Sequence, residues 1–235
     1  MKQIPVVLLA VASIGFAGLA DSAPKKRTRN ANRIGPYGMG MIGQSNWTSD
    51  QEAAEQFVTD FLINTENPVR NITTSTEEKD VGYNATFGYR FTRYFAAEVG
   101  LAQFGEVSSK ADSEMDFGDG FEPTTLRMTF SAGGPMISGL GILPLNDKFE
   151  FFGRVGYLFS SSERELTSRV SGERGSLGGI KGDSTDLVLG VGASYHFSQV
   201  YSMRVEYQQI DEIGEEDNSG VEDLSVIGIG VVVRF

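Results

Sequence analysis

The feature that most constrains this chain is the strict alternation of its last nine residues, IGIGVVVRF. Successive side chains of a β-strand point to opposite faces, so one face here is wholly apolar and the other carries Gly, Val and Arg. A soluble antiparallel sheet with one face on its core has this pattern, and so does a barrel strand that faces lipid. The number of such segments, and the way they are joined, decides between the two. The apolar face consists of Ile227, Ile229, Val231, Val233 and Phe235.

Eight segments of the chain alternate in this way. Long polar connections follow the first, third, fifth and seventh segments, and short turns follow the second, fourth and sixth. Every long connection therefore lies at one end of an up-and-down meander, which is typical of transmembrane barrels. We predict an all-β fold, an eight-stranded antiparallel up-and-down transmembrane β-barrel whose last strand pairs with its first. The segments are 33–47, 81–91, 95–102, 126–142, 149–159, 187–197, 201–207 and 227–235.

The long connections are predicted to be loops with one exception. In the first of them, apolar residues recur at helical spacing over 49–64, and Ser49 with Glu52 forms a capping box. This predicts a short amphipathic helix in the first extracellular loop. Residues 71–80, 106–122, 160–183 and 211–223 are predicted to be polar loops. The Gly133-Gly134-Pro135 sequence predicts a kink or bulge in the fourth strand, because proline cannot donate to a ladder.

The second face of the strands carries charges. An eight-stranded barrel leaves room inside for side chains only, so these charges should pair across the lumen. On the fourth segment this places Arg127 inward, with Leu126 and Phe130 toward lipid. The pairs either rigidify the barrel or switch to open a narrow path, and ion pairs away from water are not automatically stabilising. The predicted lumen network comprises Arg90, Glu98, Arg127, Glu150, Arg154, Arg204 and Glu206.

Aromatic residues sort by height when the segments are laid alternately up and down. Two belts about one bilayer apart are expected where amphipathic rings sit at head-group level. The belt at the short-turn end would contain Tyr37, Tyr89, Phe91, Tyr94, Phe95, Phe149, Phe151, Tyr195, Phe197, Tyr201 and Phe235, and the other belt Trp47, Tyr83, Tyr157, Phe159 and Tyr207.

The N-terminal region predicts export. Residues 1–20 have a basic start, an apolar stretch and small residues at the end, as in a secretory signal peptide. Residues 21–32 form a basic tail, and 33–235 the outer-membrane β-barrel. The absence of cysteine excludes disulfides and thiolate metal sites, and a formal net charge of −11 argues against nucleic acid as a partner.

Several stretches resemble a known family. FGYRFTRYFAAEVGL (87–101), LNDKFEFFGRVGYLF (145–159), VGASYHFS (191–198), MRVEYQ (203–208) and the terminal aromatic strand are similar to the small outer-membrane β-barrels, which include the OmpA transmembrane domain and the OmpX/Ail proteins. The resemblance implies an integral protein of the Gram-negative outer membrane with both termini in the periplasm. It implies outer-membrane lipid and lipopolysaccharide as surroundings, and a terminal strand that the barrel assembly machinery reads. Because the sequence ends at the barrel, we do not expect the peptidoglycan-binding domain that follows the barrel in full-length OmpA.

The residues offer little chemistry. His196 is the one histidine, and Ser194 and Ser198 make a dyad conceivable, although ordinary hydrogen bonding is the simpler interpretation. The clustered loop carboxylates lack EF-hand spacing. We therefore predict no catalytic residue, no cofactor and no metal site. The leading hypothesis is a non-enzymatic barrel that supports envelope integrity and presents loops for adhesion or other surface contact. A narrow channel and a lipid-modifying enzyme remain as alternatives.

Overall fold

The computed structural model describes residues 33–49, 56, 59, 60, 62, 63, 67–77, 79–211, 213 and 221–235, so the predicted signal peptide and basic tail lie outside the described residues. No helix within these ranges is long and apolar enough to cross a membrane. The described strands are β1 (Gly35–Ser49), β2 (Val69–Glu77), β3 (Lys79–Arg90), β4 (Phe95–Asp116), β5 (Phe121–Pro144), β6 (Phe149–Val170), β7 (Glu173–His196), β8 (Tyr201–Asp211) and β9 (Val221–Arg234).

Eight of these strands are hydrogen-bonded in a ring. The order is β4-β3-β1-β9-β8-β7-β6-β5, and β5 pairs back to β4. The terminal strand β9 pairs with β1 in an antiparallel ladder that begins at Tyr37 opposite Arg234. Ring-like pairing leaves no open sheet edge in this part of the molecule, which is the condition for placing β-structure in lipid.

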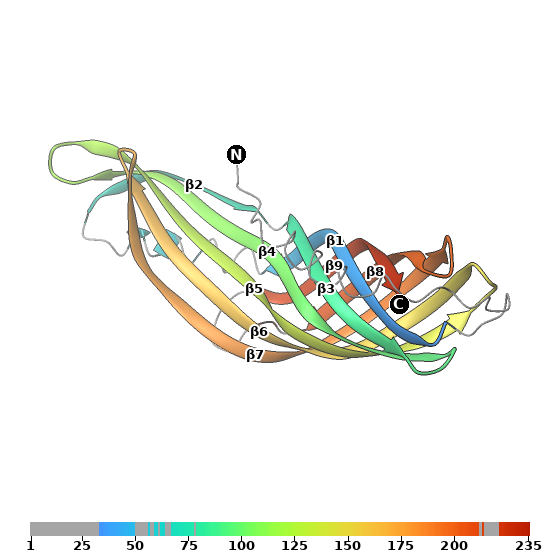
Figure 1. Ribbon diagram of the computed structural model, residues 1–235. Coiled ribbons are helices and arrows are strands. Elements are labelled where there is room, and N and C mark those ends of the chain that lie inside the picture. Colours follow the sequence, from blue (N-terminus) through green and yellow to red (C-terminus); the bar gives the residue numbers. More distant parts are fainter. Residues whose placement is uncertain are drawn as a thin grey trace.

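Four strands continue well past the ring. β3 pairs with β4 only as far as Gln103, and β8 pairs with β7 only as far as Val188. Beyond these points β4 to β7 form two long hairpins that project from one end of the barrel (Figure 1). We call this projection the arm and define it as residues 106–116, 121–131, 161–170 and 173–183, together with β2, which pairs with β4.

The arm corrects the prediction of polar loops. Residues 71–77, 106–116, 121–122 and 160–183 are mostly β-strand. The outer face of these stretches is polar, and apolar residues such as Val107, Ala111 and Met115 are interspersed with serines on the inner face, so the alternation gave little apolar signal. The hairpins extend because their ladders continue from barrel strands already in register. Ser171 and Gly172 form the β6–β7 turn with φ values of 46° and 95°, as a two-residue type I′ turn requires.

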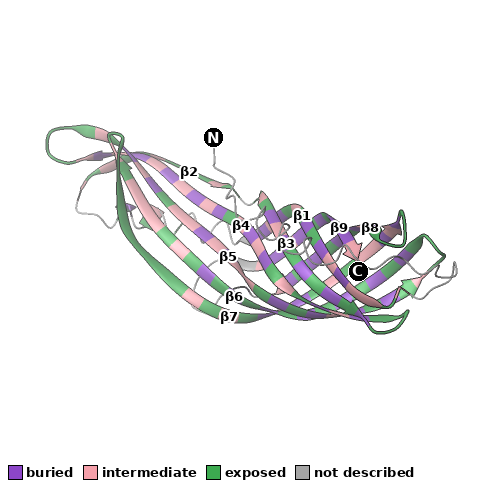
Figure 2. Ribbon diagram, viewed as in Figure 1, coloured by how far each residue is buried: buried purple, intermediate pink, exposed green. Residues whose placement is uncertain are grey.

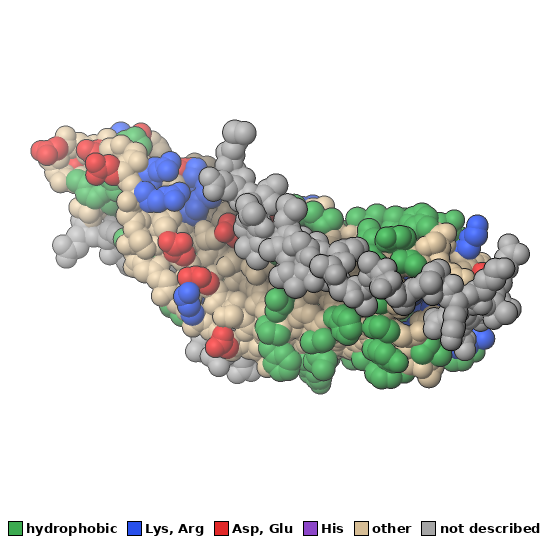
Figure 3. All heavy atoms as spheres, in the orientation of Figure 1, with side chains coloured by type: hydrophobic (Ala, Val, Ile, Leu, Met, Phe, Trp, Pro, Cys, Tyr) green, Lys and Arg blue, Asp and Glu red, His purple; other side chains and the backbone are tan. Residues whose placement is uncertain are grey.

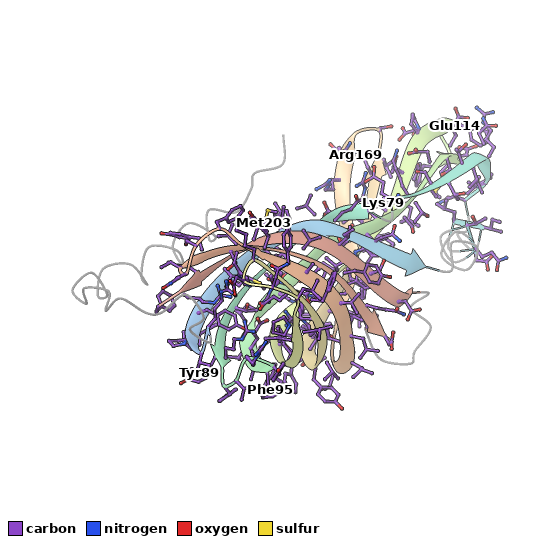
Figure 4. The ribbon with its side chains drawn as sticks, turned by 90° about the vertical axis from the view of Figure 1, so that its right-hand side faces the viewer. Lys79, Tyr89, Phe95, Glu114, Arg169 and Met203 are labelled. Carbon is purple, nitrogen blue, oxygen red and sulfur yellow. The ribbon has the colours of Figure 1, made fainter. Side chains whose placement is uncertain are left out.

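The outward face of the barrel is apolar. Alternating burial runs along its strands (Figure 2), and hydrophobic side chains cover the barrel while charged side chains gather on the arm (Figure 3). Tyr89 and Phe95 lie at the end of the barrel away from the arm (Figure 4), and both are exposed. The outward face of β9 is likewise exposed at Ile227, Ile229, Val231 and Phe235.

Strand β5 corrects a second prediction. Leu126 and Phe130, expected to face lipid, are buried, and Arg127 is exposed. The reason is that this part of β5 belongs to the arm, whose concave face needs apolar side chains. Within the barrel, β5 likewise turns Leu140 inward and Ile137 outward.

The predicted aromatic belts hold two wrong members. Tyr37 is 3% exposed and Trp47 is fully buried, so both point into the barrel. Trp47 packs edge-on against the ring of Phe130 at 5.5 Å between centroids.

Part of the first long connection is helical. Gln56, Thr59, Asp60, Leu62 and Ile63 have helical backbone, and the other residues of the predicted helix, apart from Ser49 at its start, lie outside the described part of the chain.

The irregularity expected at residues 133–135 appears mainly in the partner strand. The register of the β4–β5 ladder shifts between Gln103 and Glu106 of β4. Gly105, with φ of 75°, is one of two β4 residues that stand opposite the single residue Ala132 of β5, as in a β-bulge.

Candidate functional site

The centre of the lumen holds a buried cluster of alternating charges. Arg154 of β6 donates from Nη2 to Glu98 Oε2 of β4 at 2.7 Å and pairs through Nε with Glu206 of β8. Arg204 of β8 donates to Glu98 Oε1 at 2.7 Å. The Tyr37 hydroxyl donates to the same oxygen at 2.6 Å. Two arginines and two glutamates therefore balance in charge, and the Glu98 carboxylate joins β4 to three other strands.

Glycines make room for this cluster. A Cβ on Gly88 of β3 would lie 2.3 Å from the Tyr37 ring, and a Cβ on Gly192 of β7 would lie 2.3 Å from the Phe152 ring. The Phe152 ring in turn lies under Arg204, with 4.6 Å between the guanidinium carbon and the ring centroid. The inward glycines thus provide space for large side chains in a narrow barrel.

A second charged cluster lies at the short-turn end. Arg90 Nη1 donates to both oxygens of Glu150, at 3.2 and 2.9 Å. His196 places Nε2 3.3 Å from the Glu150 carboxylate and Nδ1 2.7 Å from Ser202 Oγ. Arg234 Nη1 also donates to Ser202 Oγ, at 2.6 Å. This cluster ties the ends of five strands together.

His196 therefore pairs with Ser202 rather than with Ser194 or Ser198. The order of contacts resembles the acid, base and nucleophile of a hydrolase, with His196 between Glu150 and Ser202. The Ser202 side chain is only 1% exposed, however, and Arg234 occupies one side of its oxygen. A substrate carbonyl cannot reach this oxygen in the structure, so the arrangement serves to hold strands together.

An apolar layer fills the lumen on the arm side of the central cluster. Its members come from β1 and from β4 to β9, together with Ile213, so it spans most of the barrel cross-section. Side chains, rather than open space, thus occupy the lumen at this level. The layer consists of Trp47, Ala102, Phe104, Val107, Phe130, Ala132, Met136, Leu158, Val188, Ile210, Ile213, Leu224 and Val226.

Six of the predicted network residues lie in the two lumen clusters, and Arg127 does not. Arg127 lies on the outer face of the arm, opposite Lys110 and Thr167 in the ladders, because the apolar side chains of β5 take the inner face there. Sequence reasoning missed Tyr37 and Ser138 as partners. Arg154 Nη1 donates to Ser138 Oγ at 2.5 Å. Alternation along β1 could have identified Tyr37, because it lies on the face opposite Ile42. Ile42 points outward and is 57% exposed, so Tyr37 must point into the lumen.

Exposed ion pairs fasten the strands of the arm. Arg70 of β2 donates to Glu114 of β4 at 2.6 Å, and Asn71 donates to the same oxygen at 3.1 Å. The hydrogen bond from Arg70 lowers the pKa of the Glu114 carboxyl. Burial raises the pKa of Asp112, but hydrogen bonds from Lys110 and Thr125 outweigh it and lower that pKa. No group of three carboxylates or imidazoles suited to a metal ion occurs among the described residues.

Comparisons with known proteins agree with this architecture. The family described as "OmpA-like transmembrane domain" matches residues 37–235. The chain belongs to this family. It is 26% identical over 238 residues to Outer membrane protein A of Yersinia pseudotuberculosis serotype I and 24% identical over 240 residues to Outer membrane protein A of Klebsiella aerogenes. Each alignment covers 100% of this chain and 56% of the relative, so the chain spans about half the length of these relatives.

Solved structures with similar folds include outer-membrane barrels. The N-terminal β-barrel domain of Pseudomonas aeruginosa OprF gives a TM-score of 0.44 at 10% identity, covering 86% of this chain and 98% of that one. Yersinia pestis Ail, in complex with the heparin analogue sucrose octasulfate, gives 0.39 at 11% identity, covering 86% and 100%. Membership of the OmpA-like transmembrane domain family indicates that the chain is an integral outer-membrane protein.

Proposed function

We propose that this OmpA-like barrel is a non-enzymatic outer-membrane protein that supports envelope integrity and presents its arm outside the cell for surface contact. The observation that carries the proposal is the change along one outward face. On β6 this face is apolar at Val155, Tyr157 and Phe159, and is then polar or charged from Ser161 to Arg169. A strand that crosses a bilayer needs only about 9–11 residues, so β6, at 22 residues, extends well beyond it.

The orientation follows from the same asymmetry. Gly35 and Arg234 lie at the short-turn end of the barrel, opposite the arm. Short turns of outer-membrane barrels face the periplasm and long connections face outward. The first and last strands would then both have their chain termini in the periplasm, with lipid and lipopolysaccharide around the apolar band. The inaccessible Ser202 oxygen supports a non-enzymatic role.

Single cysteines test this orientation cleanly, because the native chain has none. Asp119 lies in the turn between β4 and β5 at the end of the arm, and Asn146 lies in a short turn. In intact cells, a membrane-impermeant maleimide should label Asp119→Cys and leave Asn146→Cys unlabelled until the outer membrane is permeabilised. Labelling of Asn146→Cys in intact cells, or protection of Asp119→Cys, would contradict the proposal. Heat-modifiable migration of both variants on gels is the control for folding.

A further inference from the structure

Three arginines lie together on the outer face of the arm. Arg169 of β6 stands directly opposite Arg174 of β7. Thr125 of β5 stands opposite Arg169, so Arg127, two residues farther along β5, is a diagonal neighbour on the same face. All three arginines are exposed. Figure 4 shows Arg169 near the end of the arm, far from Tyr89 and Phe95 at the other end of the barrel.

The other cations on this face have carboxylate partners. Lys110 pairs with Asp112 at 2.5 Å, and Lys181 pairs with Glu163 at 3.2 Å. Within the described residues, Arg127, Arg169 and Arg174 form no ion pair; Glu165, diagonal to Arg127 across the β5–β6 ladder, does not reach it.

This arrangement costs stability unless an anion is bound. Like charges directly opposite each other on a sheet are destabilising. The Arg169–Arg174 pair is notable because the protein as a whole is acidic, with a net charge of −11. Within the described ranges no carboxylate forms an ion pair with these three guanidinium groups. Asp112, diagonal to Arg127 across the β4–β5 ladder, interacts with it electrostatically but is already hydrogen-bonded to Lys110 and Thr125.

The chemistry of the groups indicates what the anion is. Guanidinium groups bind sulfate and phosphate oxygens through two parallel hydrogen bonds. Opposite residues have Cβ atoms about 5 Å apart and diagonal ones about 7–8 Å apart, so the three long side chains can contact neighbouring oxyanions of one polymer. Neutral sugars between such anions would lie on the polar side chains of Thr125 and Thr167.

The height of the cluster indicates where the anion comes from. Arg169 is ten residues beyond Phe159, the last apolar outward residue of β6. At a rise of about 3.3 Å per residue this is roughly 33 Å along the strand, which at a strand tilt of about 40° corresponds to roughly 25 Å of height. The cluster therefore stands clear of the lipid head groups and is open to polymers from outside the cell.

We propose that Arg127, Arg169 and Arg174 form a binding site for an extracellular polysaccharide that carries closely spaced sulfate or phosphate groups. The site rests on the proposed function in one respect, that the arm is outside the cell.

The test uses the full chain in nanodiscs of phosphatidylcholine, without lipopolysaccharide. The site variant is Arg127→Gln/Arg169→Gln/Arg174→Gln. The matched control is Lys110→Gln/Arg164→Gln/Lys181→Gln, which removes the same charge from the same arm but leaves the three arginines. The probe is a sulfated heparin octasaccharide, titrated by calorimetry, with dextran as the uncharged comparison.

We expect the site variant to bind the octasaccharide at least about tenfold more weakly than the native chain, because several charge-assisted hydrogen bonds are lost. The control should stay within about threefold, since screening limits general charge effects at physiological salt. Equal losses in both variants, or no binding by the native chain, would overturn the site. Tighter binding of deacylated lipopolysaccharide than of the octasaccharide would overturn the external source.

Hydrogen exchange supplies a second readout on the free protein. Arg174→Gln alone should slow exchange of amides in the β6–β7 hairpin, because it removes the like-charge pair, and the octasaccharide should slow them in the native chain. Unchanged exchange in both experiments would count against the cluster as a site. Failure of cysteine labelling would instead reject the orientation of the arm, and heat-modifiable migration shows whether each variant has folded.

Discussion

Arg154 shows how strongly a single side chain can stabilise the lumen. Both its ion pairs, with Glu98 and Glu206, have fully buried side chains. Arg154→Met should lower the free energy of unfolding by about 3–5 kcal/mol, because buried Glu206 loses its cation and buried Glu98 keeps only Arg204. Urea unfolding in lipid vesicles, followed by the fluorescence of Trp47, measures this directly, since Trp47 is the one tryptophan and is fully buried.

Arg127 provides the matched control, since the same substitution there removes an exposed arginine. Arg127→Met should change the unfolding free energy by no more than about 0.5 kcal/mol. If the two variants lost equal stability, the lumen network would have no special role in holding the barrel together.

The contrast between these two arginines also shows what alternation can predict. Alternation determines which side chains share a face, and it placed Arg154 with Glu150 correctly. It does not determine which face is inward. In β5 the apolar set was assigned to lipid, but beyond the bilayer the same kind of set lines the concave side of the arm. The pairing partners of His196 depend on strand register, which the sequence pattern does not provide.

At the scale of the element, β2 depends on an ion pair that acid should break. The pKa of Glu114 is lowered by Arg70, so its contribution is present above the ordinary carboxyl pKa and is lost as the pH falls through the lowered value. We expect amides of β2 to lose protection as the pH is lowered below about 4. Hydrogen exchange, corrected for the intrinsic pH dependence of exchange, measures the effect.

Arg70→Gln is the companion variant for this measurement. It should reduce the protection of β2 at neutral pH and remove most of its acid dependence, while amides of β8 in the barrel remain protected in both proteins. Acid dependence that persists in Arg70→Gln would assign the effect to another group.

The arm could be anticipated from the sequence only in part. Its turn sequences were available, since Ser171-Gly172 is a recognised hairpin dipeptide. Its strands were not, because polar side chains on both faces look like loop. These strands extend because they pair cooperatively with their neighbours. For example, β4 forms ladders with three strands, β2, β3 and β5. Such support depends on the whole sheet, not on the local sequence.

At the scale of the whole molecule, the lumen is filled by two kinds of layer. The central charged cluster is followed on the arm side by the apolar layer that contains Trp47 and Phe130. An ion would have to break buried ion pairs and then cross an apolar constriction, which is a barrier to conduction.

We expect no steady conductance from the native protein in planar bilayers. Trp47→Ala/Phe130→Ala should permit brief openings if the apolar layer is the barrier; discrete, reproducible conductance from the native chain would contradict this.

The terminal strand presents an apolar face outward, and we predict that it is also the signal for barrel assembly. Phe235 is 54% exposed and contributes one backbone hydrogen bond, from its N–H to Pro36 O at 3.2 Å. The β1–β9 ladder from Tyr37 opposite Arg234 onward does not depend on it. Deleting Phe235 should therefore lower the stability of the barrel in vesicles by only about 1 kcal/mol.

In cells the deletion should reduce the amount of folded protein in the outer membrane several-fold, because the assembly machinery would read a terminal strand without its aromatic end. Ile42→Ala, a comparable loss from the exposed face of β1, should accumulate normally. Heat-modifiable protein in outer-membrane fractions is the readout, and equal accumulation of the deletion and the native chain would show that Phe235 is not part of the signal.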